Sequence, residues 1–218
     1  MRGSSPLIHC ITNYVTAGDT ANMLLAAGAS PIMADDPSES AEITALAQGL
    51  TLNLGTPSGS RVEAMLRSGA EANRRGIPVV FDPVGAGCSG FRRNSAGEIL
   101  RRVRLTAIRG NLSEISYLAG FESRENGVDS SETRITAAEA AQTAAKKLGC
   151  VCAVTGERDV ISDGSRTVTI LSGTPLLKKV TGAGCMTSAL CAVMCTASDG
   201  FVGAAAGIAL MDLSLIHI

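Results

Sequence analysis

Residues 180–187 combine a glycine-rich turn, a thiol and the start of an apolar segment with the composition of a helix over 186–197. Gly182 and Gly184 would free the backbone to bring successive N–H groups together, and a helix N-terminus adds unpaired donors and the positive end of its dipole. A concave site of this kind suits the negative charge that builds on a phosphoryl group during transfer. The alternative is that Thr181 caps the helix and the glycines only turn the chain.

Cys185 lies at the start of this predicted helix, where a thiol can act as a base. The helix N-terminus should lower the pKa of the thiol and raise its thiolate content. A base at this position could accept a proton from a substrate hydroxyl as that hydroxyl attacks phosphorus. In most proteins, however, a cysteine at such a position is a small and inert residue.

Polar side chains follow five predicted strands, at the point where each strand ends. These strand exits are residues 9–13, 53–56, 82–87, 109–111 and 155–157. Functional groups of parallel sheets gather at the carboxyl ends of the strands. The exits therefore predict one crevice that carries carboxylates, amides and an arginine, although each exit alone could be an ordinary turn with a capping side chain.

Asp82 and Glu114 supply carboxylates at two neighbouring strand exits. Together they could hold one Mg²⁺, directly or through water, since this ion usually keeps several waters. Arg109 follows an apolar strand, where a buried arginine usually meets a phosphate or a carboxylate. Each residue also has a structural interpretation: Asp82 as a turn residue before proline, Glu114 as a carboxylate that complements a helix dipole, and Arg109 as half of a salt bridge.

Residues 85–90 match the pattern G-x-G-x-x-G and follow a predicted strand, which is typical of dinucleotide-binding enzymes. Asp82 and Pro83 separate the strand from the first glycine, which displaces the tight turn that this motif needs. The next strand ends in Arg109 rather than in an acidic residue that would bind a ribose, although an arginine would suit NADP. An NADP-dependent oxidoreductase stays open as an alternative.

The composition argues against nucleic acid and membrane surfaces as partners. The 218 residues carry 19 basic and 20 acidic side chains, and the formal net charge of −1 provides no electrostatic surface for polyanions. Arginines at positions 92, 93, 101, 102 and 104 alternate with apolar residues at helical spacing, which favours a solvated helix face. Two tyrosines, four phenylalanines and no tryptophan leave little surface for base stacking.

Targeting signals and metal-binding cysteine patterns are not evident in the sequence. The first residues lack the apolar core of a signal peptide and the apolar run 201–211 is too short to span a bilayer, so we expect a cytoplasmic protein. Seven cysteines in such a protein are expected to be free thiols. Their spacing contains no C-x-x-C pair and does not favour zinc.

Strand-like and helix-period segments alternate along the chain, which predicts one α/β domain over residues 1–218 with a largely parallel sheet. The predicted strands are 7–12, 51–54, 78–81, 106–108 and 150–154, followed by a hairpin of 160–162 and 167–171. The predicted helices are 17–27, 38–48, 61–75, 95–103, 112–118, 137–148 and 186–197. Residues 122–134 are predicted to form a long polar loop.

Six motifs occur in order along the chain, namely PLIHCITN (6–13), GASPIM (28–33), DPVGAG (82–87), IRGN (108–111), TGE (155–157) and VTGAGC (180–185). Through them the chain resembles the hydroxyethylthiazole kinases of the ribokinase-like superfamily. The resemblance implies a three-layer α/β/α sandwich with a mostly parallel central sheet and no lid domain. It also implies Mg²⁺-assisted transfer of phosphate from ATP to the hydroxyl of 4-methyl-5-(2-hydroxyethyl)thiazole in thiamine biosynthesis, by a homotrimer with active sites at its subunit interfaces.

The resemblance further implies substrate and nucleotide contacts. Met33 and Asn13 correspond to contacts of the thiazole alcohol, and Gly182 corresponds to the substrate-side glycine of the anion site. The positions that would bind ATP are Arg109, Thr155, Ala183 and Gly184.

The same resemblance places the metal and the base. Asp82 and Glu114 would hold Mg²⁺, with Asn111 and Glu114 forming the N-x-x-E element of the superfamily. Cys185 occupies the position at which most members of the superfamily have an aspartate base.

Both ends of the chain depart from the family pattern, which usually has a helix before Pro6 and more helix after Met211. We therefore expect a truncated domain in which residues 212–218 are a non-native tail. Two further alternatives stay open beside the oxidoreductase: a ribokinase-like kinase of a different small alcohol, and an inactive remnant that binds the thiazole but cannot hold ATP.

Overall fold

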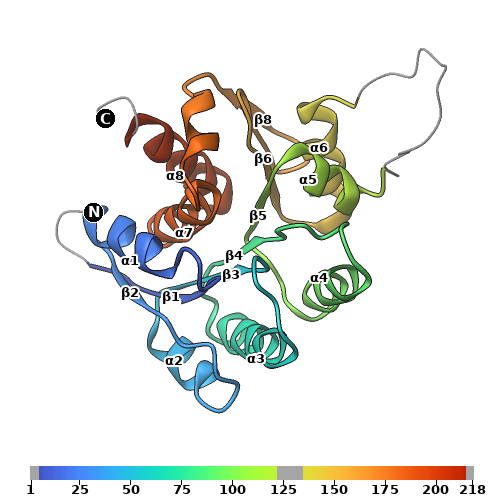
Figure 1. The fold of residues 1–218 in the computed structure, drawn as a ribbon. Coiled ribbons are helices and arrows are strands. Elements are labelled where there is room, and N and C mark those ends of the chain that lie inside the picture. The colour runs from blue at the N-terminus through green and yellow to red at the C-terminus, as the bar shows by residue number, and fades with distance from the viewer. Residues whose placement is uncertain (1–4, 122–134, 215–218) are drawn as a thin grey trace.

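The computed structural model describes residues 5–121 and 135–214, and their strands form a single sheet (Figure 1). Eight strands in these residues have the order β2-β1-β3-β4-β5-β6-β7-β8. They are β1 (Leu7–Ile11), β2 (Ser30–Ile32), β3 (Gly49–Asn53), β4 (Val79–Asp82), β5 (Ala107–Gly110), β6 (Val151–Val154), β7 (Asp159–Ser162) and β8 (Thr167–Ile170). Neighbours from β2 to β6 pair in parallel, whereas β7 and β8 are antiparallel additions at one edge. The predicted, mostly parallel sheet is confirmed.

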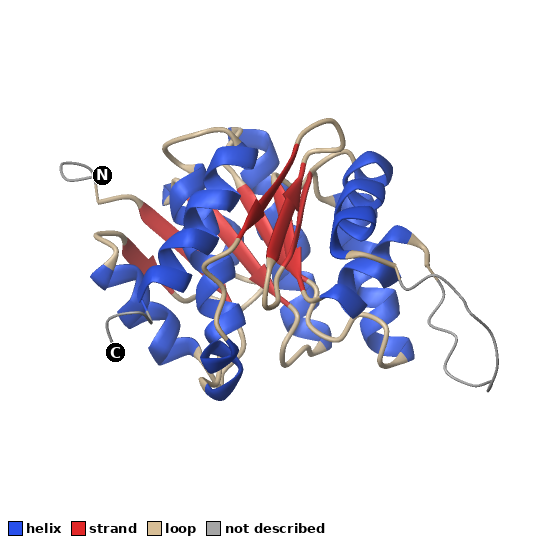
Figure 2. Cartoon of the chain, turned by 90° about the horizontal axis from the view of Figure 1, so that it is seen from above, coloured by secondary structure: helices blue, strands red, loops and turns tan. Residues whose placement is uncertain are grey.

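Helices cover both faces of the sheet (Figure 2). One layer consists of α1 (Ala17–Ala26), α7 (Ala183–Cys195) and α8 (Gly200–Ser214). The other consists of α2 (Ser40–Leu46), α3 (Gly59–Arg75), α4 (Gly90–Arg102), α5 (Leu112–Ala119) and α6 (Ala137–Leu148), and a short 3₁₀ helix, η1 (Pro175–Lys179), precedes α7. This is the three-layer α/β/α sandwich expected from the sequence.

The central strands are apolar on both faces because each face is covered by helices. Phe81, Leu52 and Met65 belong to the core between the sheet and α3 to α6. Ile8 and Ile208 belong to the core on the opposite face, beneath α1, α7 and α8. The two cores hold the central strands rigidly, so the side chains at the strand exits have fixed positions.

Helices α4 and α7 begin earlier in the chain than the sequence predicts. Ser89 Oγ accepts a hydrogen bond from Arg92 N at 3.2 Å, so α4 begins at Gly90 rather than at residue 95 as predicted. Helix α7 begins at Ala183 rather than at residue 186, with Gly182 as its N-cap. Three residues of the glycine turn, 183–185, therefore belong to the first turn of the helix.

Three elements, β2, η1 and α8, were not predicted from the sequence.

The structure describes all seven cysteines, and they are free thiols, as expected. Within the described residues, no helix is long and apolar enough to cross a membrane. The predicted loop 122–134 and residues 215–218 of the expected tail lie outside the described part of the chain.

Candidate active site

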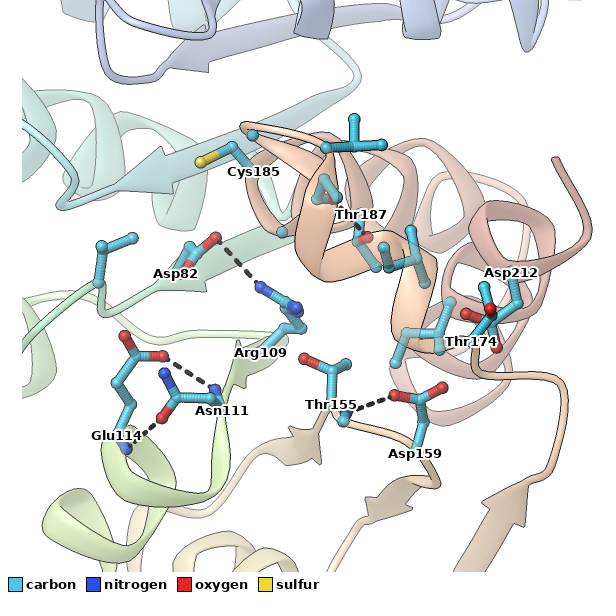
Figure 3. Close-up of a pocket in the computed structure, with 18 residues that line it drawn as sticks. Asp82, Arg109, Asn111, Glu114, Thr155, Asp159, Thr174, Cys185, Thr187 and Asp212 are labelled. Atoms are coloured by element: carbon cyan, nitrogen blue, oxygen red, sulfur yellow. Dashed lines mark hydrogen bonds and ion pairs between the residues drawn. The ribbon is translucent and has the colours of Figure 1, made fainter. Parts of the chain in front are cut away.

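A cavity of about 430 Å³ opens at the carboxyl edge of the sheet, where strand exits meet the N-terminus of α7 (Figure 3). The sequence-predicted residues that line it are Asp82, Arg109, Asn111, Glu114, Thr155, Gly182, Ala183, Gly184 and Cys185. The expected crevice with carboxylates, an amide and an arginine is thus present in the fold.

The glycine turn has the geometry of an anion site. Gly182 has φ +81°, a conformation that side chains other than glycine rarely adopt, and a Cβ there would lie 2.3 Å from Thr16 Cγ2. Gly184 and Cys185 lie in the first turn of α7, where backbone N–H groups have no intrahelical acceptor. The alternative in which Thr181 caps the helix is wrong, since Gly182 is the N-cap and makes no side-chain cap bond.

Arg109 lies directly against this turn. A Cβ at Gly184 would be 2.5 Å from Arg109 Nη1, so the glycine leaves room for the guanidinium. Arg109 Nη1 is 3.8 Å from Asp82 Oδ2, and its buried Nε has no hydrogen-bond acceptor in the described residues. Because this ion pair is loose and the guanidinium lines the cavity, Arg109 can still bind an anion there.

Cys185 is a neutral thiol rather than the activated thiolate predicted from its helix position. Burial, and then the Asp82 carboxylate, raise the pKa of the thiol, while hydrogen bonds from Thr16, Asn13 and Asn53 only partly offset them. Cys185 Sγ accepts a hydrogen bond from Asn13 Nδ2 at 3.0 Å. The expectation of a lowered pKa was wrong because the sequence does not show that a buried carboxylate lies beside the sulfur.

Asp82 is the last residue of β4 and is buried, with 2% of its surface exposed. Its Oδ2 accepts hydrogen bonds from Asn53 Nδ2 at 3.0 Å and from Ser188 Oγ at 2.8 Å. Burial raises the pKa of Asp82 to about 6, and the Glu114 carboxylate also raises it, against the opposing effect of Arg109. The interpretation of Asp82 as an ordinary turn residue is therefore wrong.

Glu114 has a structural role in addition to lining the cavity. It forms a capping box with Asn111: Glu114 Oε2 accepts from Asn111 N, and Asn111 Oδ1 accepts from Glu114 N, both at 2.9 Å. Glu114 Oε1 accepts from Gly85 N at 2.9 Å, which joins α5 to the loop after β4.

A metal at this position would depend on few protein ligands. In the ranges 5–121 and 135–214, no group of three or more His, Cys, Asp or Glu side chains could hold a metal ion. Asp82 and Glu114 nevertheless line one cavity and carry carboxylate oxygens. This pair fits Mg²⁺ that takes most of its ligands from water and phosphate.

The two predicted thiazole contacts lie outside the cavity lining. Asn13 is buried behind Cys185 and donates to its sulfur, as described above. Met33 follows β2, the edge strand that pairs with β1, and is 37% exposed. Thr155 lines the cavity, and its Oγ1 donates to Gly110 O at 3.3 Å.

Sequence reasoning missed a second carboxylate pair in the cavity, Asp159 and Asp212. Asp159 Oδ1 accepts from Gly156 N at 2.9 Å, whereas Asp212 Oδ2 accepts from Ser172 Oγ at 2.9 Å. Burial raises the pKa of Asp159 to about 7, and the nearby Asp212 also raises it. One signal in the sequence could have identified Asp159: it lies four positions after Thr155, at the start of a strand. That strand, β7, was predicted to begin at residue 160 rather than at Asp159.

Arg92 is a further residue that the sequence misplaced. It was expected on a solvated helix face, but its guanidinium donates to the carbonyl oxygens of Val84 at 2.6 Å, Gly55 at 2.7 Å and Leu54. These carbonyls belong to the loops that follow β3 and β4. Arg92 therefore fixes the two loops that flank Asp82, whereas Arg93 is exposed as predicted.

Comparison with known proteins gives one consistent family. The sequence model of the hydroxyethylthiazole kinase family matches residues 1–214. The chain is 51% identical over 218 residues to the hydroxyethylthiazole kinase of Ruminiclostridium cellulolyticum, covering 98% of this chain and 80% of the relative. It is 49% identical over 220 residues to that of Clostridium beijerinckii, with the same shares covered.

Solved structures agree with the sequence comparison. The hydroxyethylthiazole kinase of Pyrococcus horikoshii superposes with a TM-score of 0.85 at 38% identity, covering 94% of this chain and 76% of that structure. The pyridoxal kinase of Bacillus subtilis, solved as an ADP complex, superposes with a TM-score of 0.65 at 17% identity, which supports the ribokinase-like fold alone. None of these matches supports the alternative of an NADP-dependent oxidoreductase.

Proposed function

The chain belongs to the hydroxyethylthiazole kinase family, and we propose that it transfers the γ-phosphoryl group of ATP to the hydroxyl of 4-methyl-5-(2-hydroxyethyl)thiazole, a step of thiamine biosynthesis. As a member of this family, it is a kinase that transfers phosphate to an alcohol. The observation that carries the proposal is the turn at Gly182–Cys185, which lines the same cavity as Arg109 and Asp82 at the N-terminus of α7.

The turn and Arg109 supply the electrostatic part of the chemistry. Phosphoryl transfer passes through a loose transition state with charge spread over the phosphoryl oxygens. The backbone N–H groups of Gly184 and Cys185, fixed in the first turn of α7, would stabilise that charge without reorganisation. Arg109, which lies directly against the turn, and Thr155 would bind the nucleotide phosphates, with Ala183 and Gly184 completing the phosphate site.

Asp82 and Glu114 would hold Mg²⁺, largely through water. When bound, Mg²⁺ neutralises charge on the phosphates and orients them for in-line transfer. Asp82 is suited to this role because burial makes its negative charge costly without a nearby cation. Glu114 keeps both oxygens on backbone N–H groups, so its contribution is to fix the loop after β4 and to add negative charge.

Cys185 would accept the hydroxyl proton late in the reaction through the minor fraction of its sulfur that has already lost its own proton to solvent, since a neutral thiol cannot take up a second proton. Its sulfur is held by Asn13 at the mouth of the anion turn, next to the position that the alcohol must reach. Because the loose transition state requires little nucleophile activation, a base that is only partly ionised is sufficient. Asn13 and Met33 would contact the thiazole on this side.

The position of Met33 supports a homotrimer with interfacial active sites. Met33 follows an edge strand, and the nearby Tyr14 and Val15 are 73% and 59% exposed. Exposed apolar side chains beside a substrate contact are typical of a surface that another subunit covers. The second copy would close the thiazole site that the isolated chain leaves open.

The substrate is tested by measuring ADP release with a panel of small alcohols. We expect Mg·ATP consumption with the hydroxyethylthiazole and none with 4-methyl-5-ethylthiazole, which lacks the hydroxyl. Gly182→Ala should abolish turnover, whereas Gly59→Ala, at a helical position with no atom within 4 Å of the added Cβ, should not. Preferred turnover of another alcohol would support the other-kinase alternative, and thiazole binding without ATP binding would support the inactive remnant.

A further inference from the structure

Asn53 joins two parts of the site that the sequence presents separately. It is the last residue of β3, is only 3% exposed, and lies in register with Asp82 of β4. The resemblance gives it no role, and it does not line the cavity. Its side-chain amide nevertheless contacts both the carboxylate side and the thiol side of the site.

Each atom of the Asn53 amide has a defined partner. Asn53 Nδ2 donates to Asp82 Oδ2 at 3.0 Å. Asn53 Oδ1 accepts from Asn13 Nδ2 at 3.1 Å and from Gly55 N at 2.9 Å. Because the backbone N–H can only donate and an ionised carboxylate can only accept, these two partners fix the orientation of the amide.

Asn13 extends the connection to the thiol. Its Nδ2 donates both to Asn53 Oδ1 and to Cys185 Sγ, the latter at 3.0 Å. Its Oδ1 accepts from Thr16 N and Thr16 Oγ1, both at 3.2 Å. A continuous chain of hydrogen bonds therefore runs from Asp82 through Asn53 and Asn13 to Cys185, and both of its end residues line the cavity (Figure 3).

The packing around the amide prevents it from moving aside. A Cβ at Gly55 would lie 2.8 Å from Asn53 Oδ1 and 2.9 Å from Asn13 Cβ, so the backbone approaches the amides closely. Arg92 holds the Gly55 and Val84 carbonyls from the other side. Loss of the amide would therefore leave Asp82 with Ser188 Oγ as its remaining side-chain donor and would remove the oxygen acceptor of Asn13 Nδ2, in a position where relaxation is restricted.

We propose that Asn53 is a positioning residue for phosphoryl transfer, which sets the distance between the Asp82 carboxylate on the phosphate side and the Cys185 thiol on the alcohol side. This inference rests on the proposed function and assigns a residue that acts through Asp82 and Asn13. Transfer requires the attacking oxygen and the phosphoryl group to be held in line, and a misplacement of 1 Å can reduce the rate about 100-fold.

The test replaces Asn53 by aspartate, which has the same shape but no amide donor. Asn53→Asp should lower kcat about 10- to 100-fold while changing the KM for ATP much less, because the phosphate contacts of Arg109 and α7 persist. Asn73→Asp is the matched control: the Asn73 amide bridges two backbone groups of Arg104, but it is only half-buried and does not line the cavity. The control should keep the wild-type kcat.

A second readout needs neither substrate. The alkylation rate of Cys185 by iodoacetamide is followed by peptide mass spectrometry, with the exposed Cys88 as internal reference. Asn53→Asp replaces a group that stabilises the thiolate by one that repels it, so alkylation of Cys185 should slow several-fold relative to Cys88. Gly55→Ala, which presses on the same amides without a charge change, should also alter this ratio and keeps the test available if Asn53→Asp does not fold.

The outcomes separate the inference from the proposed function. A wild-type protein that makes no thiazole phosphate would refute the function, while the alkylation ratio would still show whether Asn53 positions the thiol. Wild-type kcat in a folded Asn53→Asp protein would overturn the inference. So would an unchanged ratio of Cys185 to Cys88 alkylation in both Asn53→Asp and Gly55→Ala. Equal losses of kcat in Asn53→Asp and Asn73→Asp would show a general effect on stability and would also overturn the inference.

Discussion

Gly184→Ala tests whether the contact between Arg109 and the first turn of α7 is needed for catalysis. The new Cβ would lie 2.5 Å from Arg109 Nη1 and 3.3 Å from Cζ. Ordinary van der Waals contact begins near 3.4 Å, so the guanidinium must move by about 1 Å. The backbone is helical at this position and Gly184 has no positive φ, so the substitution adds no backbone strain.

The expected effect falls on activity rather than on stability. Replacing a helical glycine by alanine favours the folded state by up to about 1 kcal/mol, which offsets the cost of moving a flexible side chain. A hydrogen bond from a charged group contributes about 1.5–3 kcal/mol. Loss of the Arg109 contact to phosphate should therefore reduce kcat/KM for ATP about 10- to 150-fold, at 1.4 kcal/mol for each factor of ten.

The assay combines steady-state kinetics with thermal unfolding. Gly59→Ala is the matched control, since it makes the same change in helix α3 without a neighbour within 4 Å, and it should keep the wild-type kinetics. A Gly184→Ala protein with wild-type kcat/KM for ATP would refute the argument that glycine is required there to accommodate Arg109. A large loss of Tm would show that Arg109 cannot move aside and would attribute the lost activity to misfolding.

Three further predictions concern the thiol, the buried carboxylates and the assembly. Cys185→Asp should keep or raise kcat because a carboxylate is ionised at neutral pH, whereas Cys185→Ala should lose mainly kcat; wild-type turnover of the alanine variant would make the thiol a bystander. The pKa of Asp159 is about 7 in the fold and therefore lies above its value in the unfolded chain. Between about pH 4 and 7 the native state binds more protons than the unfolded state, so the free energy of unfolding falls as pH rises through that range. Asp159→Asn should therefore raise Tm at pH 8 by a few degrees and little at pH 4, and equal shifts at both pH values would contradict this. Light scattering should give three times the mass of the chain, and Tyr14→Asp should lower that mass if the exposed residues beside Met33 form the interface; a wild-type monomer with full activity would refute an interfacial site.

The sequence predicts the sheet and the position of the site well because both depend on local patterns. Apolar runs that end in polar residues identified the exits at Asp82, Arg109 and Thr155, and parallel pairing brings such ends to one edge. Strand β2 was missed because it has three residues, of which Pro31 cannot donate to a neighbouring strand, and all three are only half-buried. Its place at the edge of the sheet follows from tertiary pairing with β1.

The chemistry of the site depends on contacts between distant segments, which no local pattern shows. The pKa of Cys185 is raised rather than lowered because the thiol is buried and because the Asp82 carboxylate, 103 positions earlier, lies beside it. The role of Arg92 was missed for a similar reason, since the three carbonyls that it binds lie on two other loops. Helix α8 contains Gly203 and Gly207, which weaken the helix signal, and it forms because it packs against α7.

On the proposed function, backbone donors at Gly182–Cys185 and the side chain of Arg109 stabilise the phosphoryl group as it passes from ATP to the thiazole alcohol. The most direct measurement is ³¹P NMR of the wild-type protein with Mg·ATP and 4-methyl-5-(2-hydroxyethyl)thiazole. We predict one phosphomonoester signal that grows in step with ADP and that is absent with Gly182→Ala. ADP formed with inorganic phosphate as the only other product would contradict the proposed function, and a phosphomonoester formed equally well by Gly182→Ala would contradict the role of the turn.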